Sequence, residues 1–215
     1  VTSLFVDGGD GLANNKTRVS YVGNGKYQIS VMPLKPSIRL SIKINDLEIK
    51  QSPFNVTVRP GSFSSSSSLA EGHGLQRARA GEEATFIIQT KDQGGNNKIV
   101  DEALFEVHLV LVGRPIAPAS LNISNDEVVV AGSQQFMGDG KYLVKYTAYV
   151  AGEYTLHVRD SIEGEDINGS PFRVIVDPAE MSSTHSLVQG KGIHSGVAGK
   201  IAEVRVYGRD EFGNF

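Results

Sequence analysis

Val150-Ala151-Gly152-Glu153-Tyr154-Thr155-Leu156-His157-Val158 is the stretch that decides the fold of this chain. From Tyr154 onward its apolar and polar residues alternate, which is typical of a β-strand with one face in a hydrophobic core. The stretch Gly169-Ser170-Pro171-Phe172-Arg173-Val174 follows after a short connection and predicts a closing strand. Most of the remaining sequence either repeats this unit or is predicted to pack against it.

Several motifs of the chain return at a fixed spacing, which is the signature of internal repeats. Gly72-His73-Gly74-Leu75 returns as Gly190-Lys191-Gly192-Ile193, with an offset of 118 residues. Ser52-Pro53-Phe54 returns with the same offset as Ser170-Pro171-Phe172. The turn motif with Asp92, Gly95 and Asn96 also returns, as Asp210, Gly213 and Asn214.

These offsets predict three units along the chain. We expect the C-terminal part of a repeat over residues 1–59, a complete repeat over 62–177 and the N-terminal part of a further repeat over 182–215. The serine-rich run over 62–68 cannot bury much apolar surface, so it is interpreted as a linker or a solvated edge. Asp177-Pro178 marks the second boundary.

The pattern of short strands predicts an all-β fold. Each unit has alternating segments separated by turn residues, and no stretch has convincing helical periodicity. This predicts tandem antiparallel β-sandwiches of the immunoglobulin-like class. Gly152-Glu153-Tyr154 suits a tyrosine corner, in which the Tyr154 hydroxyl bonds back to the backbone.

Composition limits the classes of function. The 215 residues are 40% hydrophobic and 21% charged, with a net charge of -3, so no basic field favours nucleic acid. No apolar run is long enough to span a membrane. Cysteine is absent, which excludes disulfides and thiolate chemistry. The chain does not begin with Met, and we expect it to be a piece of a longer protein.

No set of residues predicts catalysis, a cofactor or a metal site. The five histidines are scattered without ligand spacing, and no Ser, His and Asp set has a strand–turn–helix context. Gly72-x-Gly74 precedes no helix, so it is not interpreted as a phosphate loop. We therefore expect a non-enzymatic protein.

The ordered motifs resemble those of the filamin-type immunoglobulin-like repeat. Gly72-His73-Gly74-Leu75, Ala80-Gly81, Gly140-Lys141-Tyr142 and Gly169-Ser170-Pro171-Phe172 carry the resemblance, which covers nearly the whole chain. One departure is Ile167-Asn168-Gly169, where the family usually has Ile-Pro-Gly. The resemblance implies protein binding, with a partner peptide added as a strand in the groove between the third and fourth strands.

The third strand is expected over Leu104–Val112. If its other residues face the core, alternation turns four residues outward as a candidate partner groove: Glu106, His108, Val110 and Val112. Alternatively, the neighbouring repeat or the long proline-bearing loop that follows covers them.

Four N-glycosylation sequons bear on the compartment: Asn15, Asn55, Asn122 and Asn168. Chance predicts about 1.5 for this composition, and Pro171 makes Asn168 a poor acceptor. Divergent, sequon-bearing repeats are similar to those of a plant gamete-expressed membrane protein, so we expect an adhesion segment on the extracellular face of the plasma membrane. The alternative is a cytosolic, actin-crosslinking filamin rod that acts as spacer and scaffold.

The two incomplete units predict self-association. Each would expose strand edges and half of a core, so we expect the pieces over 1–59 and 182–215 either to pair with each other, within or between chains, or to be parts cut from neighbouring repeats.

Overall fold

The computed structural model describes residues 4–13, 16–112 and 129–215. Within these ranges the regular structure is β-strand apart from three short 3-10 turns, so the all-β prediction is confirmed. The sequence also predicts a strand over 121–130, which lies mostly outside the described residues; its last two residues belong to β11.

The N-terminal unit, residues 1–59, contains two small sheets. Strand β4 pairs with β1, β5 and β6, while β2 and β3 form a separate hairpin. Much of its apolar surface is open, with Tyr21 61% and Tyr27 49% exposed, and Ile38 is one of its few buried side chains. Its elements are β1 (Leu4–Asp7), η1 (Gly9–Gly11), β2 (Arg18–Gly23), β3 (Lys26–Ser30), β4 (Ser37–Ile44), β5 (Leu47–Glu48) and β6 (Phe54–Thr57).

The middle repeat, residues 62–177, is a two-layered β-sandwich. One sheet has the order β11-β10-β14-β15-β8, and the other has the order β12-β13-β9-β7. Pairing is antiparallel except between β15 and β8, which are parallel. Its elements are β7 (Phe63–Glu71), η2 (His73–Leu75), β8 (Arg77–Arg79), β9 (Glu83–Asp92), β10 (Phe105–Leu111), β11 (Val129–Ala131), β12 (Ser133–Gly138), β13 (Lys141–Thr147), β14 (Gly152–Asp160) and β15 (Phe172–Asp177).

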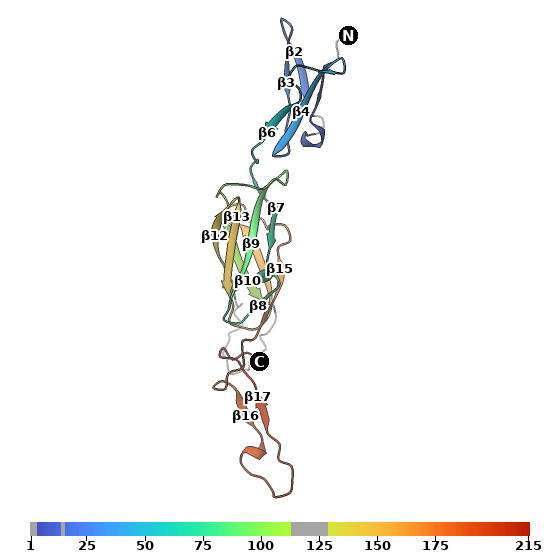
Figure 1. Ribbon diagram of the computed structural model, residues 1–215. Coiled ribbons are helices and arrows are strands. Elements are labelled where there is room, and N and C mark those ends of the chain that lie inside the picture. The colour runs from blue at the N-terminus through green and yellow to red at the C-terminus, as the bar shows by residue number, and fades with distance from the viewer. Residues whose placement is uncertain (1–3, 14–15, 113–128) are drawn as a thin grey trace.

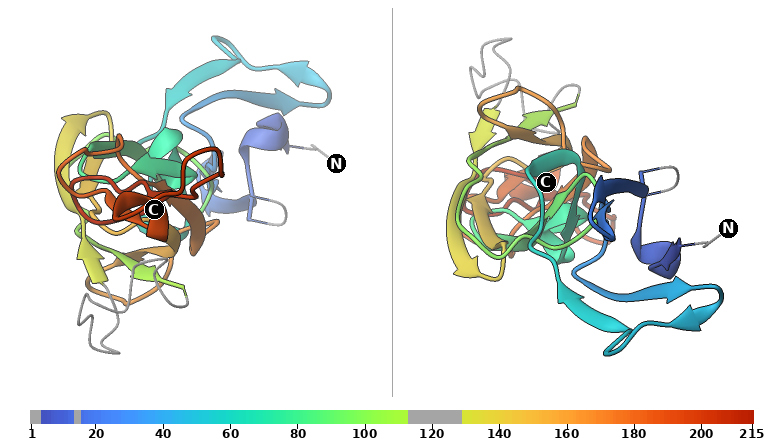
Figure 2. Two further views of the ribbon diagram at one scale, coloured as in Figure 1. Left: turned by 90° about the horizontal axis from the view of Figure 1, so that it is seen from below. Right: turned by 90° about the horizontal axis from the view of Figure 1, so that it is seen from above.

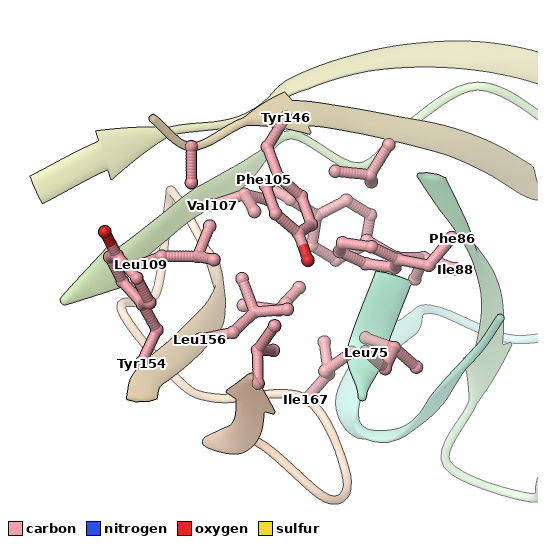
Figure 3. Close-up of a cluster of buried hydrophobic side chains, with 14 of the residues drawn as sticks. Leu75, Phe86, Ile88, Phe105, Val107, Leu109, Tyr146, Tyr154, Leu156 and Ile167 are labelled. Atoms are coloured by element: carbon pink, nitrogen blue, oxygen red, sulfur yellow. The ribbon is translucent and has the colours of Figure 1, made fainter. Parts of the chain in front are cut away.

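The core of the middle repeat lies between its two sheets (Figure 3). Alternation turns every second side chain of β9, β10, β13 and β14 inward, where Phe86, Leu109, Val144 and Leu156 are at most 1% exposed. Burying side chains of this size stabilises the fold by about 1.5–3 kcal/mol each. Alternation along 84–88 predicts that Ala84, Phe86 and Ile88 face inward; Phe86 and Ile88 are buried, and Ala84 is partly buried.

Two side-chain hydroxyls fix the ends of β14. The Tyr154 hydroxyl donates to the carbonyl oxygen of Val150 at 2.8 Å, which is the expected tyrosine corner. Burial raises the pKa of Tyr154 to about 12, so this hydroxyl keeps its proton. The Ser170 hydroxyl accepts from the Val158 N–H at 3.0 Å, and Ser52 does the same for Ile42 at 2.9 Å. The Ser-Pro-Phe motif therefore has a structural role in both units.

The interpretation of 62–68 as a linker is wrong: these residues form most of an edge strand of the second sheet, and part of that strand is buried. Residues from Phe63 onward form strand β7, paired with β9, and Ser65 and Ser68 are buried. The Ser68 hydroxyl donates to the Ser64 carbonyl oxygen at 2.7 Å and accepts from the Lys91 N–H at 3.0 Å. Serine can be buried here because its hydroxyl replaces the ladder bonds that the register shift between Ser64 and Leu69 interrupts.

The C-terminal unit, residues 182–215, extends from the far end of the middle repeat. It contains β16 (Leu187–Gln189), η3 (Lys191–Ile193) and β17 (Arg205–Tyr207). Figure 1 shows the N-terminal and C-terminal units at opposite ends of the molecule, so they do not pair within one chain. Seen from below and from above, the N-terminal unit lies to one side of the middle repeat (Figure 2). Pairing between chains stays a prediction.

Replacing Ser68 by Ala tests the role of the serine strand. The variant removes the acceptor for the Lys91 N–H, so we expect the free energy of unfolding to fall by about 1–2 kcal/mol. Urea unfolding followed by circular dichroism measures it. Ser66→Ala is the matched control, because Ser66 is exposed and its loss should change stability by less than about 0.5 kcal/mol. Equal stability of the two variants would contradict this role.

Candidate functional site

The four candidate groove residues lie on or just after β10, on the outer face of the five-stranded sheet. Phe105, Val107 and Leu109 point into the core, and the residues between them therefore point outward. Glu106 is exposed, His108 and Val110 are partly buried, and Val112 is 52% exposed.

Strand β14 supplies the other half of this surface. The register places Glu106 opposite Arg159, His108 opposite His157 and Val110 opposite Thr155. Such directly opposed side chains contact each other across a sheet. We call these six residues together with Val112 the outer face.

The two histidines form the centre of the outer face. Their rings stack with centroids 5.0 Å apart and an angle of 15° between planes. The Nδ1 atom of each ring is buried and makes no hydrogen bond among the described residues. The Glu106 Oε1 atom lies 3.8 Å from the His108 Nδ1, too far for a hydrogen bond.

Ion pairs border the outer face on both sides. At one end the Arg159 Nε atom bonds the Asp166 Oδ1 at 2.9 Å. At the other end the Arg173 guanidinium donates to the Glu153 carboxylate, with Nη2 to Oε2 at 2.8 Å. The surface between them holds the two rings, Val110 and Thr155. The charged members of the outer face, Glu106 and Arg159, lie at one end of it, so its centre has a charged rim, which is the pattern of many protein interfaces.

The edge of β10 is covered from Phe105 to Val110. Strand β11 pairs with His108–Val110, and the Gly132 N–H donates to the Val107 carbonyl oxygen at 2.8 Å. Further along, the Gln134 side-chain amide accepts from the Phe105 N–H at 2.8 Å and donates to the Ala103 carbonyl oxygen at 3.4 Å. The edge to which a partner strand would be added is therefore occupied by the chain itself. The Gln134 amide makes the two backbone hydrogen bonds there that a neighbouring strand would make.

The structure places two of the four sequon asparagines. Asn55 is exposed on β6, as is Thr57, the third residue of its sequon. Asn168 is exposed, but the hydroxyl of Ser170 in its sequon accepts the Val158 N–H. Asn15 and Asn122 lie outside the described residues.

Other kinds of site were sought in the part of the chain that the structure describes. No group of three or more His, Cys, Asp or Glu side chains there could hold a metal ion. No helix in the same residues is both long and apolar enough to cross a membrane.

Comparison with known families identifies the fold. The family described as the Filamin/ABP280 repeat matches residues 62–173, just over half of the chain. The chain belongs to this family. Filamin-type repeats are protein-interaction modules, as the resemblance of the motifs implies.

Filamins are also found among the similar curated proteins. Filamin-C of Mus musculus is 29% identical over 172 residues, covering 80% of this chain. Filamin-A of Drosophila melanogaster is 28% identical over 192 residues, covering 88%. The chain spans only 5% and 8% of the lengths of these relatives. Among solved structures, the Escherichia coli adhesin FdeC aligns with a TM-score of 0.56 and 22% identity, covering 99% of this chain and 62% of that chain, which shows a shared fold.

Two features of the site were missed from the sequence. Alternation places His157 outward, but its stacking on His108 depends on the register between β10 and β14. The bonds of Gln134 to the backbone around β10 could not be predicted, because no sequence pattern distinguishes a glutamine that bonds to a neighbouring strand from one that faces solvent.

We predict that His157 makes stability depend on pH. Burial, His108 and Arg159 lower the pKa of His157 below its ordinary value near 6.5, and Asp166 opposes them weakly. The unfolded chain therefore binds a proton more readily than the folded chain. Stability is then fully present above about pH 6.5 and falls as the pH drops through the lowered pKa.

Urea unfolding at pH 7.5 and 5.5 measures this loss. His157→Gln should reduce the difference between the two pH values, whereas His73→Gln, on an exposed residue, should leave it unchanged. An undiminished difference in His157→Gln would show that other groups cause the pH dependence.

Proposed function

We propose that this chain is an adhesion segment on the extracellular face of the plasma membrane, where its outer face binds a protein partner. The observation that carries the proposal is the centre of the outer face on β10 and β14, where the two histidine rings, Val110 and Thr155 lie between ion pairs. Membership of the filamin repeat family supports protein binding. Adhesion between gametes is the specific setting that we propose.

Physical chemistry favours the centre of the outer face as the contact. The partly buried His108, His157 and Val110 need little further desolvation, and Val112, which is 52% exposed, would gain most from being covered. The flanking Glu153–Arg173 and Arg159–Asp166 pairs would orient the partner more than they add affinity.

The mode that we propose is strand addition between the third and fourth strands. A partner strand along β10 would replace β11, which contributes three residues, and the two bonds of the Gln134 amide. Its backbone would then pair with β10 while its side chains contact the outer face. In this proposal Gln134 competes with the partner.

The exposed sequon at Asn55 supports the extracellular setting. Asn55 alternates with the partly buried Phe54 and Val56 on β6, so a glycan there would project into solvent. The alternative is a cytosolic, actin-crosslinking rod in which the repeats are spacers and docking sites. The similarity to Filamin-C of Mus musculus favours that alternative.

Glycan occupancy distinguishes the two settings. When the native gene product is isolated from its source cells, we expect an endoglycosidase to remove mass from the peptide that contains Asn55. The same chain with Asn55→Gln, expressed in a secretory host, should lack that mass and is the control. Native protein that carries no glycan and fractionates with the cytosol would contradict the extracellular proposal and favour the rod.

The binding surface is tested with peptides selected from a displayed random library, using the chain as bait. We expect Val112→Glu to weaken binding at least tenfold, about 1.4 kcal/mol. Leu69→Glu, at a 42% exposed residue of β7, is the control and should leave binding unchanged.

Gln134→Ala tests the mode of binding. Strand addition predicts tighter binding, because the variant removes a competitor for the Phe105 N–H. Unchanged binding in Gln134→Ala would contradict strand addition. If the peptides bind the Val112→Glu variant and the natural chain with equal affinity, the outer face is not the binding surface.

A further inference from the structure

The turn with Asp, Gly and Asn occurs at both joints between units. We call residues 92–96 and 210–214 the first and second Asp–Asn turns. The first follows β9 and lies at the joint between the N-terminal unit and the middle repeat (Figure 1). The second lies at the joint between the middle repeat and the C-terminal unit.

The aspartate makes the same contacts in both turns. Asp92 accepts the N–H of Gly61 at 2.8 Å and the N–H of Asn96 at 2.9 Å. Asp210 accepts the N–H of Ala179 at 2.8 Å and the N–H of Asn214 at 2.8 Å. Gly61 and Ala179 are themselves 118 residues apart, and each precedes its unit. One carboxylate therefore ties the turn to the linker.

These carboxylates stay charged at neutral pH. Burial raises the pKa of Asp92, but hydrogen bonds from the Asn96 side chain and from backbone N–H groups outweigh it and hold the pKa below its ordinary value. The pKa of Asp210 is lowered in the same way, with Asn214 as the side-chain donor. A buried, charged carboxylate that accepts several hydrogen bonds holds the backbone of the turn in one conformation.

The asparagine reaches across each joint to the unit before it. The Asn96 Nδ2 atom donates to the Leu34 carbonyl oxygen at 2.7 Å. The Asn214 Nδ2 atom donates to the Tyr149 carbonyl oxygen at 2.9 Å, and its Oδ1 accepts the Ala151 N–H at 2.9 Å. Leu34 lies between β3 and β4, and Tyr149 between β13 and β14, so both turns contact the corresponding loop.

The joints differ in one apolar residue. Phe212 in the second turn packs against Gly81 of the middle repeat, where an added Cβ would lie 2.4 Å from its ring. Its ring also meets that of Tyr149 edge-on, with centroids 5.2 Å apart. The first turn has Gly94 at the matching position, and the cleft at that joint is lined by Pro36, Val58, Pro60 and Ile99, among others.

We propose that the Asp–Asn turn is an interaction surface whose partner is one loop of the preceding repeat, the β3–β4 loop at the first joint and the corresponding β13–β14 loop at the second. Asp builds the turn and fixes the linker, and Asn makes the contact that sets the orientation of neighbouring repeats. The second joint, with Phe212 and two asparagine bonds, is held more tightly than the first. The motif thus determines the geometry of the row of repeats, a role separate from partner binding on the outer face.

Distances between spin labels across each joint test this proposal on the whole chain, which contains no native cysteine. Gln28→Cys and Gln135→Cys report on the first joint, and Gln135→Cys with Gln189→Cys report on the second; all three sites are exposed. We expect a narrow distance peak at the second joint and a broader one at the first. Asn214→Ala and Phe212→Ala should each abolish the narrow peak, and Asn96→Ala should broaden the peak at the first joint.

Asn168→Ala is the matched control, because Asn168 is an exposed asparagine of the middle repeat outside both turns and should leave both peaks unchanged. Circular dichroism shows whether each variant keeps its strands. If Asn214→Ala unfolds the small C-terminal unit, the distance at the first joint in Asn96→Ala, a variant of the middle repeat, tests the proposal instead. Unchanged distances in folded Asn96→Ala would overturn the proposal.

Discussion

Burial of one face of β14 is the constraint on which the rest of the middle repeat depends. Tyr154, Leu156 and Val158 are each 0% exposed. The strand pairs with β10 on one side and β15 on the other, so its position fixes both neighbours. Because side chains alternate, committing these three residues to the core commits Thr155, His157 and Arg159 to the outside. The candidate binding surface is therefore a consequence of the core.

The strand is also fixed at both ends by hydroxyl groups. Tyr154 holds the loop before β14, and Ser170 holds the backbone of Val158. The N-terminal unit has the serine contact through Ser52 but has Ile38 where Tyr154 would be. Its two sheets leave large apolar side chains open, whereas the middle repeat has a continuous core. Among the described residues, the middle repeat therefore combines the tyrosine contact, the serine contact and a continuous core.

The sequence predicted those features that depend on pattern along the chain. Repeat offsets and alternation led to the all-β fold, to the inward residues of β9 and to the outward direction of Val110. Contacts made by single polar side chains across strands could not be predicted. A run of serines gives no apolar signal, yet Ser68 is buried because its hydroxyl finds two backbone partners. Gln134 closes an edge that alternation alone would leave open.

The recurring motifs divide into two physical classes. Ser-Pro-Phe and the tyrosine corner act inside a repeat, where they hold one strand in place. The Asp–Asn turns act between units, since Asn96 and Asn214 bond to backbone atoms of the unit before them. Repeats joined in this way would present their outer faces at defined angles to one another.

Amide hydrogen exchange of the intact chain tests the central claim, that β14 organises the folded repeat, most directly. If the claim is right, the backbone amides of β14 exchange among the slowest in the chain, through global unfolding of the middle repeat, and those of the β2–β3 hairpin exchange much faster. Exchange of the β14 amides at the rate of the β2–β3 hairpin would contradict the claim.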